Sequence, residues 1–383
     1  MVDLAISSMA LAVYSRTQQH PPAATDASIK YQQLLRIARV TIPTLDERNI
    51  DDCLLAIFFM SRYEDVIHRP SSLNSKTPFA MSVQSFSHHD GALAILKIWK
   101  DRLSYSHPAT DIIKQTRRGV IRSALLRNLA LPEWMLKGSL FGENGLELDY
   151  DRIIVRIANV RHQLSTLLQQ EASLQTTSHE PLISRAEELN KEARDIDKAL
   201  EDWTAQIPSD WCYQRYTLID PHPWPRRHFY SSIIYSYSSP AYAVFWNHYF
   251  ATRMLIDSTR LRVLELSRPN SDDFAHKQQL ECFSHMKVMA DNLASSVPFC
   301  LQRFKVADSP NSLFCQSSIT LTTNEEIKPY MAGLIVWPLT IASSLEGVDF
   351  RQKLWFKTEL AHLGRIVGAG VLECAETDQW LKL

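Results

Sequence analysis

The adjacent histidines His88 and His89, followed by Asp90, are the first residues whose types could bind a metal or transfer a proton. Neighbouring side chains on a helix point about 100° apart, so the two imidazoles do not readily share one metal ion. The i, i+4 histidine spacing of a helical zinc site does not occur here. We therefore favour a structural interpretation, in which one histidine meets the core and the other meets solvent, and we expect no metal ligand.

A second group of reactive side chains lies between Asp220 and His228, in the sequence Asp-Pro-His-Pro-Trp-Pro-Arg-Arg-His. One carboxylate, two histidines and two arginines in a loop are typical of catalytic segments. The three prolines also fit a rigid connector that needs no chemistry, and we favour that interpretation. A helical enzyme with His222, His228 or His88 as general base remains an alternative hypothesis. We expect no catalytic residue and no enzymatic activity.

Four arginines recur on one predicted helix, at positions 117, 118, 122 and 127. A patch that contacts phosphates would look like this, and so would a solvated face, which we favour. The whole chain has a formal net charge of −1. Because nucleic-acid binding normally requires a clear basic excess, we do not expect this chain to bind DNA by itself.

Other motifs and composition exclude further classes of protein. The six cysteines are scattered without a CxxC pair, so we expect buried, reduced thiols and no cofactor. No Walker loop, GxGxxG or GxSxG motif occurs. No run of about 18 apolar residues occurs either, and Asp3 stands where a secretory signal carries positive charge, so we expect no membrane association.

The elements that must position these residues are helices. The chain has only 10 glycines among 383 residues, whereas average usage is roughly 7%. Hydrophobic residues make up 45% of the sequence, enough for a large core. Between Ile153 and Leu167 the apolar residues step by four, three, four and three, as on one face of a helix. The sequence therefore predicts an all-α protein.

About a dozen helices are expected, in one large or two intimately packed helical units. They are predicted near residues 4–13, 26–41, 47–66, 83–102, 109–128, 153–167, 181–206, 242–263, 272–304, 325–345, 349–368 and 370–382. The segment Tyr213–Ile219 is the one that could be extended. Five prolines mark 208–240 as a connector between an N-terminal half, 1–207, and a C-terminal half, 241–383. The spacing of Gly364, Gly368 and Gly370 predicts close helix packing.

Several short passages, taken in order, resemble one family. His88–Leu96 is similar to a signature of the form H-x-x-G-A-x-x-L, and Trp203–Trp211 to one of the form W-x-x-x-x-P-x-x-W. The other similar passages are Ile6–Val13, Tyr31–Val40, Asp52–Glu64, Tyr242–Leu264, Ala332–Leu339 and Leu363–Gly368. Together they resemble the regulatory domain of fungal zinc binuclear cluster transcription factors.

That resemblance implies an all-helical regulatory region, a nuclear location and control of metabolic genes. It carries over no catalytic residue, and it implies a close approach of chains beside His88 and Gly91. In this family, DNA contact comes from an N-terminal six-cysteine module that holds two zinc ions. No cysteine precedes Cys53 here, so we expect the zinc cluster to be absent, and zinc only if such a module precedes this chain.

The leading hypothesis is therefore a transcription-regulatory protein that acts through its helical surface. The expected partners are a second copy of the chain or another transcription factor, and a small-molecule effector is a further candidate partner. A helical assembly scaffold is the first alternative, and the helical enzyme is the second.

Overall fold

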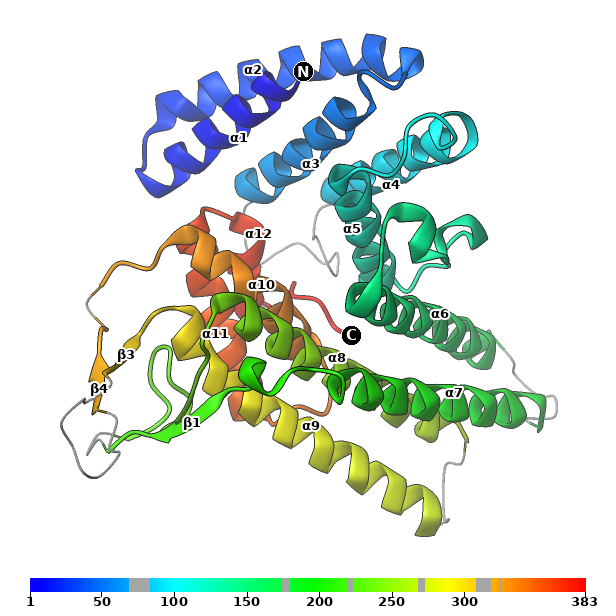
Figure 1. The fold of residues 1–383 in the computed structure, drawn as a ribbon, viewed down its shortest axis with the longest axis vertical. Coiled ribbons are helices and arrows are strands. Elements are labelled where there is room, and N and C mark those ends of the chain that lie inside the picture. The colour runs from blue at the N-terminus through cyan, green and yellow to red at the C-terminus, as the bar shows by residue number, and fades with distance from the viewer. Residues whose placement is uncertain (69–82, 174–179, 220–222, 268–272, 308–317, 324) are drawn as a thin grey trace. The chain divides into compact units, whose positions relative to one another are not determined.

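The computed structural model of the chain describes residues 1–68, 83–173, 180–219, 223–267, 273–307, 318–323 and 325–383 (Figure 1). The fold is all-α, as predicted: 74% of the structure is helical, and the strands form only two small two-stranded sheets. None of the helices described combines the length and apolar character that crossing a membrane requires.

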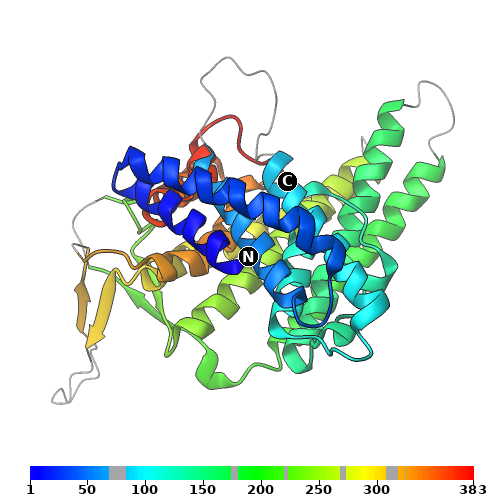
Figure 2. The same cartoon turned by 90° about the horizontal axis from the view of Figure 1, so that it is seen from above.

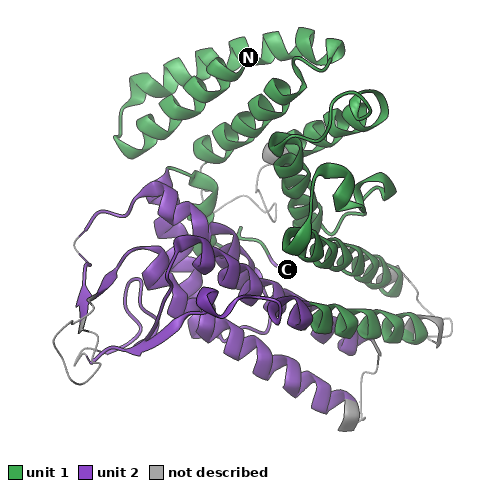
Figure 3. Ribbon diagram, in the orientation of Figure 1, with its two compact units in different colours: residues 1–199, 368–381 green, residues 200–367, 382–383 purple. Residues whose placement is uncertain are grey.

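The chain forms two compact units, drawn in different colours in Figure 3. The first contains residues 1–199 and 368–381, and the second contains residues 200–367 and 382–383. The division falls inside a helix, whereas the sequence placed a connector at 208–240. That proline-rich segment belongs to the second unit, and residues 368–381 belong to the first.

The first unit is built from the helices α1 (Val2–Thr17), α2 (Pro21–Thr41), α3 (Ile50–Ile67), α4 (Val83–Ile98), α5 (Asp111–Arg127), α6 (Gly145–Ser173), most of α7 (Glu180–Thr204) and the short α12 (Gly370–Glu373). A π-helical turn, Trp99–Leu103, follows α4, and 3-10 turns lie at Ile42–Thr44, Glu133–Met135, Gly138–Phe141 and Cys374–Glu376.

The helices α1 and α2 form a helical hairpin whose members lie side by side (Figures 1 and 2). Both helices bury small residues, since Ala5 on α1 and Ala27 on α2 are almost completely buried. The helix α2 begins at Pro21, earlier than predicted from the two prolines. Proline is tolerated in the first turn of a helix, where its missing N–H needs no partner.

Residues 368–381 close the first unit through Arg16 on α1. The Arg16 guanidinium donates to Glu373 Oε1 (2.8 Å) and to the carbonyl oxygens of Val66 (3.0 Å) and His68 (3.2 Å) at the end of α3. Those carbonyls would otherwise lack partners, because the last turn of a helix leaves its carbonyls unpaired. One cation thus joins the ends of three helices.

Two glycines make this contact sterically feasible. A Cβ atom on Gly370 would lie 2.0 Å from the His68 carbonyl oxygen. Gly368 adopts φ +71°, and a Cβ atom there would lie 3.1 Å from Val13 Cγ1. Close packing predicted for these two glycines is confirmed.

The second unit holds the last residues of α7, then α8 (Pro240–Ser267), α9 (Asp273–Cys300), α10 (Pro329–Ser344) and α11 (Phe350–Val367), with a 3-10 turn at Ser209–Trp211. The helices α8 and α9 lie side by side (Figure 1). The core includes Met254, Leu293, Val297, Leu339 and Phe356, all at most 1% exposed.

Four short strands interrupt the helices of the second unit. The strand β1 (Gln214–Thr217) pairs antiparallel with β2 (Ile233–Ser236), and β1 lies within the segment predicted to be extended. The strands β3 (Phe304–Ala307) and β4 (Ser318–Leu321) form a second antiparallel pair. The strands β2, β3 and β4 were not predicted, because strands of four residues are too short to establish an alternating pattern. The helix predicted over 272–304 therefore ends at Cys300.

The cysteines are largely as predicted. The buried thiols are Cys53, Cys282, Cys300 and Cys374. Burial raises the pKa of Cys282 to about 12 and that of Cys300 to about 11, which keeps both thiols protonated and unreactive. Cys212 is exposed, so the expectation of burial is wrong for that residue. Cys315 lies outside the described residues.

Candidate functional site

A buried polar cluster in the first unit joins three of the recognised sequence passages. The Tyr31 hydroxyl on α2 donates to Glu64 Oε1 on α3 (2.7 Å), and it lies 3.1 Å from His88 Nε2 on α4. Because the tyrosine proton goes to the carboxylate, His88 acts as the donor to the tyrosine oxygen. Burial alone would raise the pKa of Glu64, but the nearby His88 imidazole and the hydrogen bond from Tyr31 lower it below its usual value. The cluster cross-links three helices.

His88 and His89 do not divide between core and solvent as predicted. Both are half-buried, and burial, with nearby Arg127 and Arg62, lowers the pKa of His89 to about 4. The expectation that another segment of the chain closely approaches Gly91 is also wrong. A Cβ atom there would lie 4.0 Å from Ile57 Cδ1, which is an ordinary contact distance.

The predicted basic face on α5 is wrong as well. Arg117 is completely buried and forms a bidentate ion pair with Asp151. Arg118 Nε donates to Glu143 Oε1 (2.7 Å), and Arg127 Nη2 donates to Asp90 Oδ1 (2.7 Å). Acidic residues distant in the sequence thus neutralise three of the four arginines, and the pattern that resembled a phosphate patch serves helix packing.

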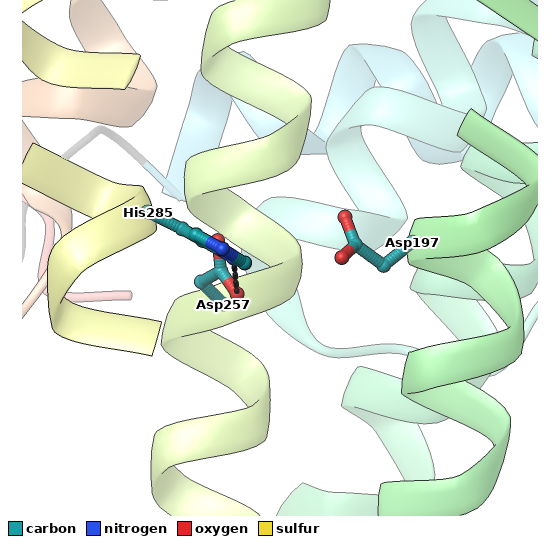
Figure 4. A group of neighbouring side chains, drawn as sticks. All are labelled: Asp197, Asp257 and His285. Carbon is teal, nitrogen blue, oxygen red and sulfur yellow. Dashed lines mark ion pairs between the residues drawn. The ribbon is translucent and has the colours of Figure 1, made fainter. Parts of the chain in front are cut away.

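Asp257 on α8 and His285 on α9 are a second pair of possible metal ligands (Figure 4). His285 Nδ1 lies 3.9 Å from Asp257 Oδ1, and Arg260 Nη1 lies 3.6 Å from the same oxygen. The carboxylate therefore already has a cationic partner one helical turn away on α8. Asp197, also drawn in Figure 4, belongs to the first unit.

The second unit contains a cavity of about 480 Å³ that is open to solvent. Three segments line it: residues 226–229, the residues Arg303, Thr323, Glu325 and Ile327 around the β3–β4 pair, and His362 and Ile366 of α11. This volume falls in the range of small-molecule sites, which is roughly 300–1,000 Å³. Residues 226–229 include the end of the loop that the sequence analysis interpreted as either a connector or a catalytic segment.

His228 is held at the cavity wall by Glu359 on α11. Its backbone N–H donates to Glu359 Oε1 and its Nδ1 donates to Glu359 Oε2, both at 2.8 Å. The His228 side chain is 7% exposed and that of Glu359 is 2% exposed, so the pair is buried. The two bonds hold His228 in a left-handed backbone conformation, φ +67°, which is uncommon for a residue other than glycine.

The neighbouring turn fixes Arg226. Arg226 N–H donates to the Phe229 carbonyl (2.8 Å), and the Trp355 indole donates to the Arg226 carbonyl (3.1 Å). The Arg226 guanidinium lies 4.0 Å from the centre of the Trp224 ring and 5.5 Å from that of Phe229. Contacts of this kind stabilise a cation through the ring quadrupole and restrict its motion.

Arg303, 2% exposed, is the most deeply buried cation of the cavity wall. Its Nε donates to the Leu301 carbonyl (2.7 Å), and its Nη1 donates to the carbonyls of Thr323 (3.2 Å) and Glu325 (2.8 Å). Its Nη2 is buried and has no hydrogen-bond partner among the described residues. Burial lowers the pKa of the Arg303 guanidinium, while Glu325 opposes that shift.

Cationic side chains outnumber acidic ones among the residues that line the cavity. Three arginines line it against one carboxylate, that of Glu325, and Lys305 Nζ pairs with that carboxylate at 2.7 Å. The ring centres of His228 and His362 lie 5.2 Å apart. Burial, with nearby His228 and Arg227, lowers the pKa of His362. The arrangement is suited to receive an anion.

Sequence reasoning found only part of this site. It singled out His228, but Asp220 and His222 of the same loop lie outside the described residues. It missed Arg303, Glu359 and His362, which carry no motif and approach the loop only through the fold. His88 and His228 belong to different units, so the catalytic histidines of the enzyme hypothesis do not form one cluster within either unit.

No protein family, no curated protein and no solved structure matches this chain.

Proposed function

We propose that this chain is a helical transcription-regulatory protein that acts in the nucleus through protein partners. The observation that carries the proposal is that the sequence passages behind the family resemblance supply residues that pack the helices together. Tyr31, Glu64 and His88 come from three of those passages, and they form one hydrogen-bonded cluster. A regulatory domain that lacks catalytic residues would use such motif residues for packing.

The tryptophan passage supports the same proposal. Trp203 stacks on Phe245 with ring centres 4.3 Å apart, and Trp211 stacks on Tyr242 at 4.7 Å. The Trp246 indole also donates to the Trp211 carbonyl (2.9 Å). Both tryptophans of the passage thus anchor the aromatic face of α8, the helix that follows in the resemblance. Stacked aromatic pairs contribute to packing beyond their buried area.

A reporter assay tests the proposal. The full chain is fused to a heterologous DNA-binding module and expressed in yeast with a reporter gene under that module's operator. We expect the fusion to change transcription at least about threefold relative to the module alone, which is an effective shift of under 1 kcal/mol. A fluorescent fusion of the same chain should accumulate in the nucleus.

Two controls sharpen the assay. The Trp203→Ala variant removes the stacking partner of Phe245 and should abolish the change, because truncating a buried tryptophan costs about 3–5 kcal/mol. Exposed Tyr105, which is 92% exposed, provides the matched aromatic control as Tyr105→Ala. If neither the wild-type fusion nor co-expression with candidate partner factors alters the reporter, the scaffold alternative replaces this proposal.

A further inference from the structure

We propose that the cavity of the second unit binds a small organic anion, whose carboxylate or phosphate group is held by Arg303 and by the arginines of the 226–229 turn. The site is independent of the regulatory function proposed above, because it rests on the chemistry of the cavity alone. The argument has three parts: an unsatisfied buried donor, preorganised cations and an apolar remainder of the wall.

Arg303 supplies the unsatisfied donor. Backbone carbonyls bind its Nε and Nη1, which fixes the plane of the guanidinium, while Nη2 stays buried without a hydrogen-bond partner in the part of the chain that the structure describes. An unpaired buried donor on a charged group is costly. An anion in the cavity beside Arg303 would compensate this buried charge, and interactions between charged groups are stronger than neutral hydrogen bonds.

The turn supplies preorganised positive charge. The Arg226 guanidinium lies against the Trp224 ring, which restricts the side chain, so less side-chain freedom remains to be lost on binding. The Trp355 indole separately holds the backbone of the turn through the Arg226 carbonyl. Arg227 is exposed at the same wall and adds a second charge that a ligand can reach from solvent. Glu325 is the one acidic lining residue, and Lys305 neutralises it.

The rest of the cavity wall indicates what the non-anionic part of the ligand should be. Phe229, Ile327 and Ile366 are apolar lining residues, so a ligand that fills the cavity presents an apolar or aromatic portion beside its anionic group. Inorganic phosphate would satisfy Arg303 but leave this apolar surface uncovered. An aromatic or aliphatic acid, or the corresponding phosphate ester, matches both parts of the wall.

Calorimetric titration of the purified full chain tests the proposal. The probes are phenyl phosphate, 3-phenylpropanoate and pyrophosphate in a low-chloride buffer, with 3-phenylpropanamide as the neutral counterpart. We expect phenyl phosphate or 3-phenylpropanoate to bind with a Kd below about 1 mM, and more tightly than pyrophosphate. The neutral amide should give no saturable heat, because it cannot pair with the arginines.

Variants locate the binding. Arg303→Lys keeps a charge but loses the planar fork and should weaken binding by about tenfold, and Arg227→Gln should weaken it by about threefold. Arg351→Gln removes an exposed arginine of α11 outside the cavity and should bind as the wild type does. If circular dichroism shows that Arg303→Lys does not fold, Arg226→Gln takes its place with an expected loss of about fivefold.

Two results would overturn the proposal. One is the absence of binding by the wild-type chain to all three anions up to about 10 mM. The other is binding that the arginine substitutions in the cavity leave unchanged, which would place the anions elsewhere on the surface. Because titration uses the isolated chain, its failure and the failure of the reporter assay are distinguishable.

Discussion

Arg117 and Asp151 form a bidentate ion pair in the interior of the first unit, with Nη1–Oδ1 at 2.6 Å and Nη2–Oδ2 at 3.0 Å. Their side chains are 0% and 6% exposed. Arg117 also donates Nε and Nη2 to the carbonyl of Met135. The charge on α5 is therefore compensated by the charge on α6, and neither residue is accessible for binding a nucleic acid.

Asp151→Asn should destabilise the protein strongly. The substitution leaves the Arg117 charge buried beside a neutral amide, and breaking a buried pair in this way costs about 3–5 kcal/mol. Urea unfolding of the full chain, followed by circular dichroism, measures the change. The control is Asp149→Asn, which breaks the exposed pair with Arg152 and should cost less than about 1 kcal/mol. Equal midpoints for the two variants would contradict the prediction.

Gly370→Ala should also destabilise the protein, by about 1–3 kcal/mol. The new Cβ atom would lie 2.0 Å from the His68 carbonyl oxygen and 2.7 Å from Arg16 Cζ, so it would force apart the contact that closes the first unit. The melting temperature and the urea midpoint report the effect. Gly119→Ala is the matched control, because a Cβ atom there meets nothing within 4 Å. That variant should gain up to about 1 kcal/mol, because alanine favours a helix interior.

The lowered pKa of His89 predicts that the stability of the protein depends on pH. Its pKa is about 4 in the folded chain, against an ordinary value of 6.5. Between those values the unfolded chain binds a proton that the folded chain does not, so stability falls as the pH is lowered through this window. The loss from about pH 7 to about pH 5.5 should be about 1 kcal/mol from this one group.

The His89→Gln variant tests this dependence. Urea unfolding at the two pH values should show a smaller difference for the variant than for the wild type. His276→Gln, which removes an exposed histidine of α9, is the control for the loss of an imidazole. If the difference in stability between the two pH values is the same in His89→Gln as in the wild type, the pH dependence comes from other groups.

The helices were predictable because their periodicity extends over several turns. The apolar steps between Ile153 and Leu167 lie inside the observed α6, and those of 242–263 lie inside α8. The start of α2 was misplaced because a proline pair either breaks a helix or begins one, and only the tertiary context decides. The strands β3 and β4 pair with each other across residues that no periodicity connects.

The role of a charged residue could be predicted only where its ion-pair partner is close in the sequence. Arg118 pairs with Glu143, 25 positions away, and Arg117 pairs with Asp151, 34 positions away. No spacing rule connects such residues, so a set of neutralised arginines, one buried and two half-buried, looked like an exposed basic face. The cavity arises in the same way. His228 was visible as a histidine in a loop, but Glu359 reaches it from 131 positions further along the chain.

Residues 368–381 have a consequence for how the chain reaches its folded state. Arg16 and Glu373 are 357 positions apart, yet they belong to the same compact unit. During synthesis, α1, α2 and α3 leave the ribosome long before Gly370 and Glu373 have been made. Until then, Arg16 can bind the carbonyls of Val66 and His68 but lacks its ion pair with Glu373. The first unit thus cannot be completed until residues 368–381 have been made, although domains generally fold in the order of synthesis. Contacts of such high sequence separation also slow folding.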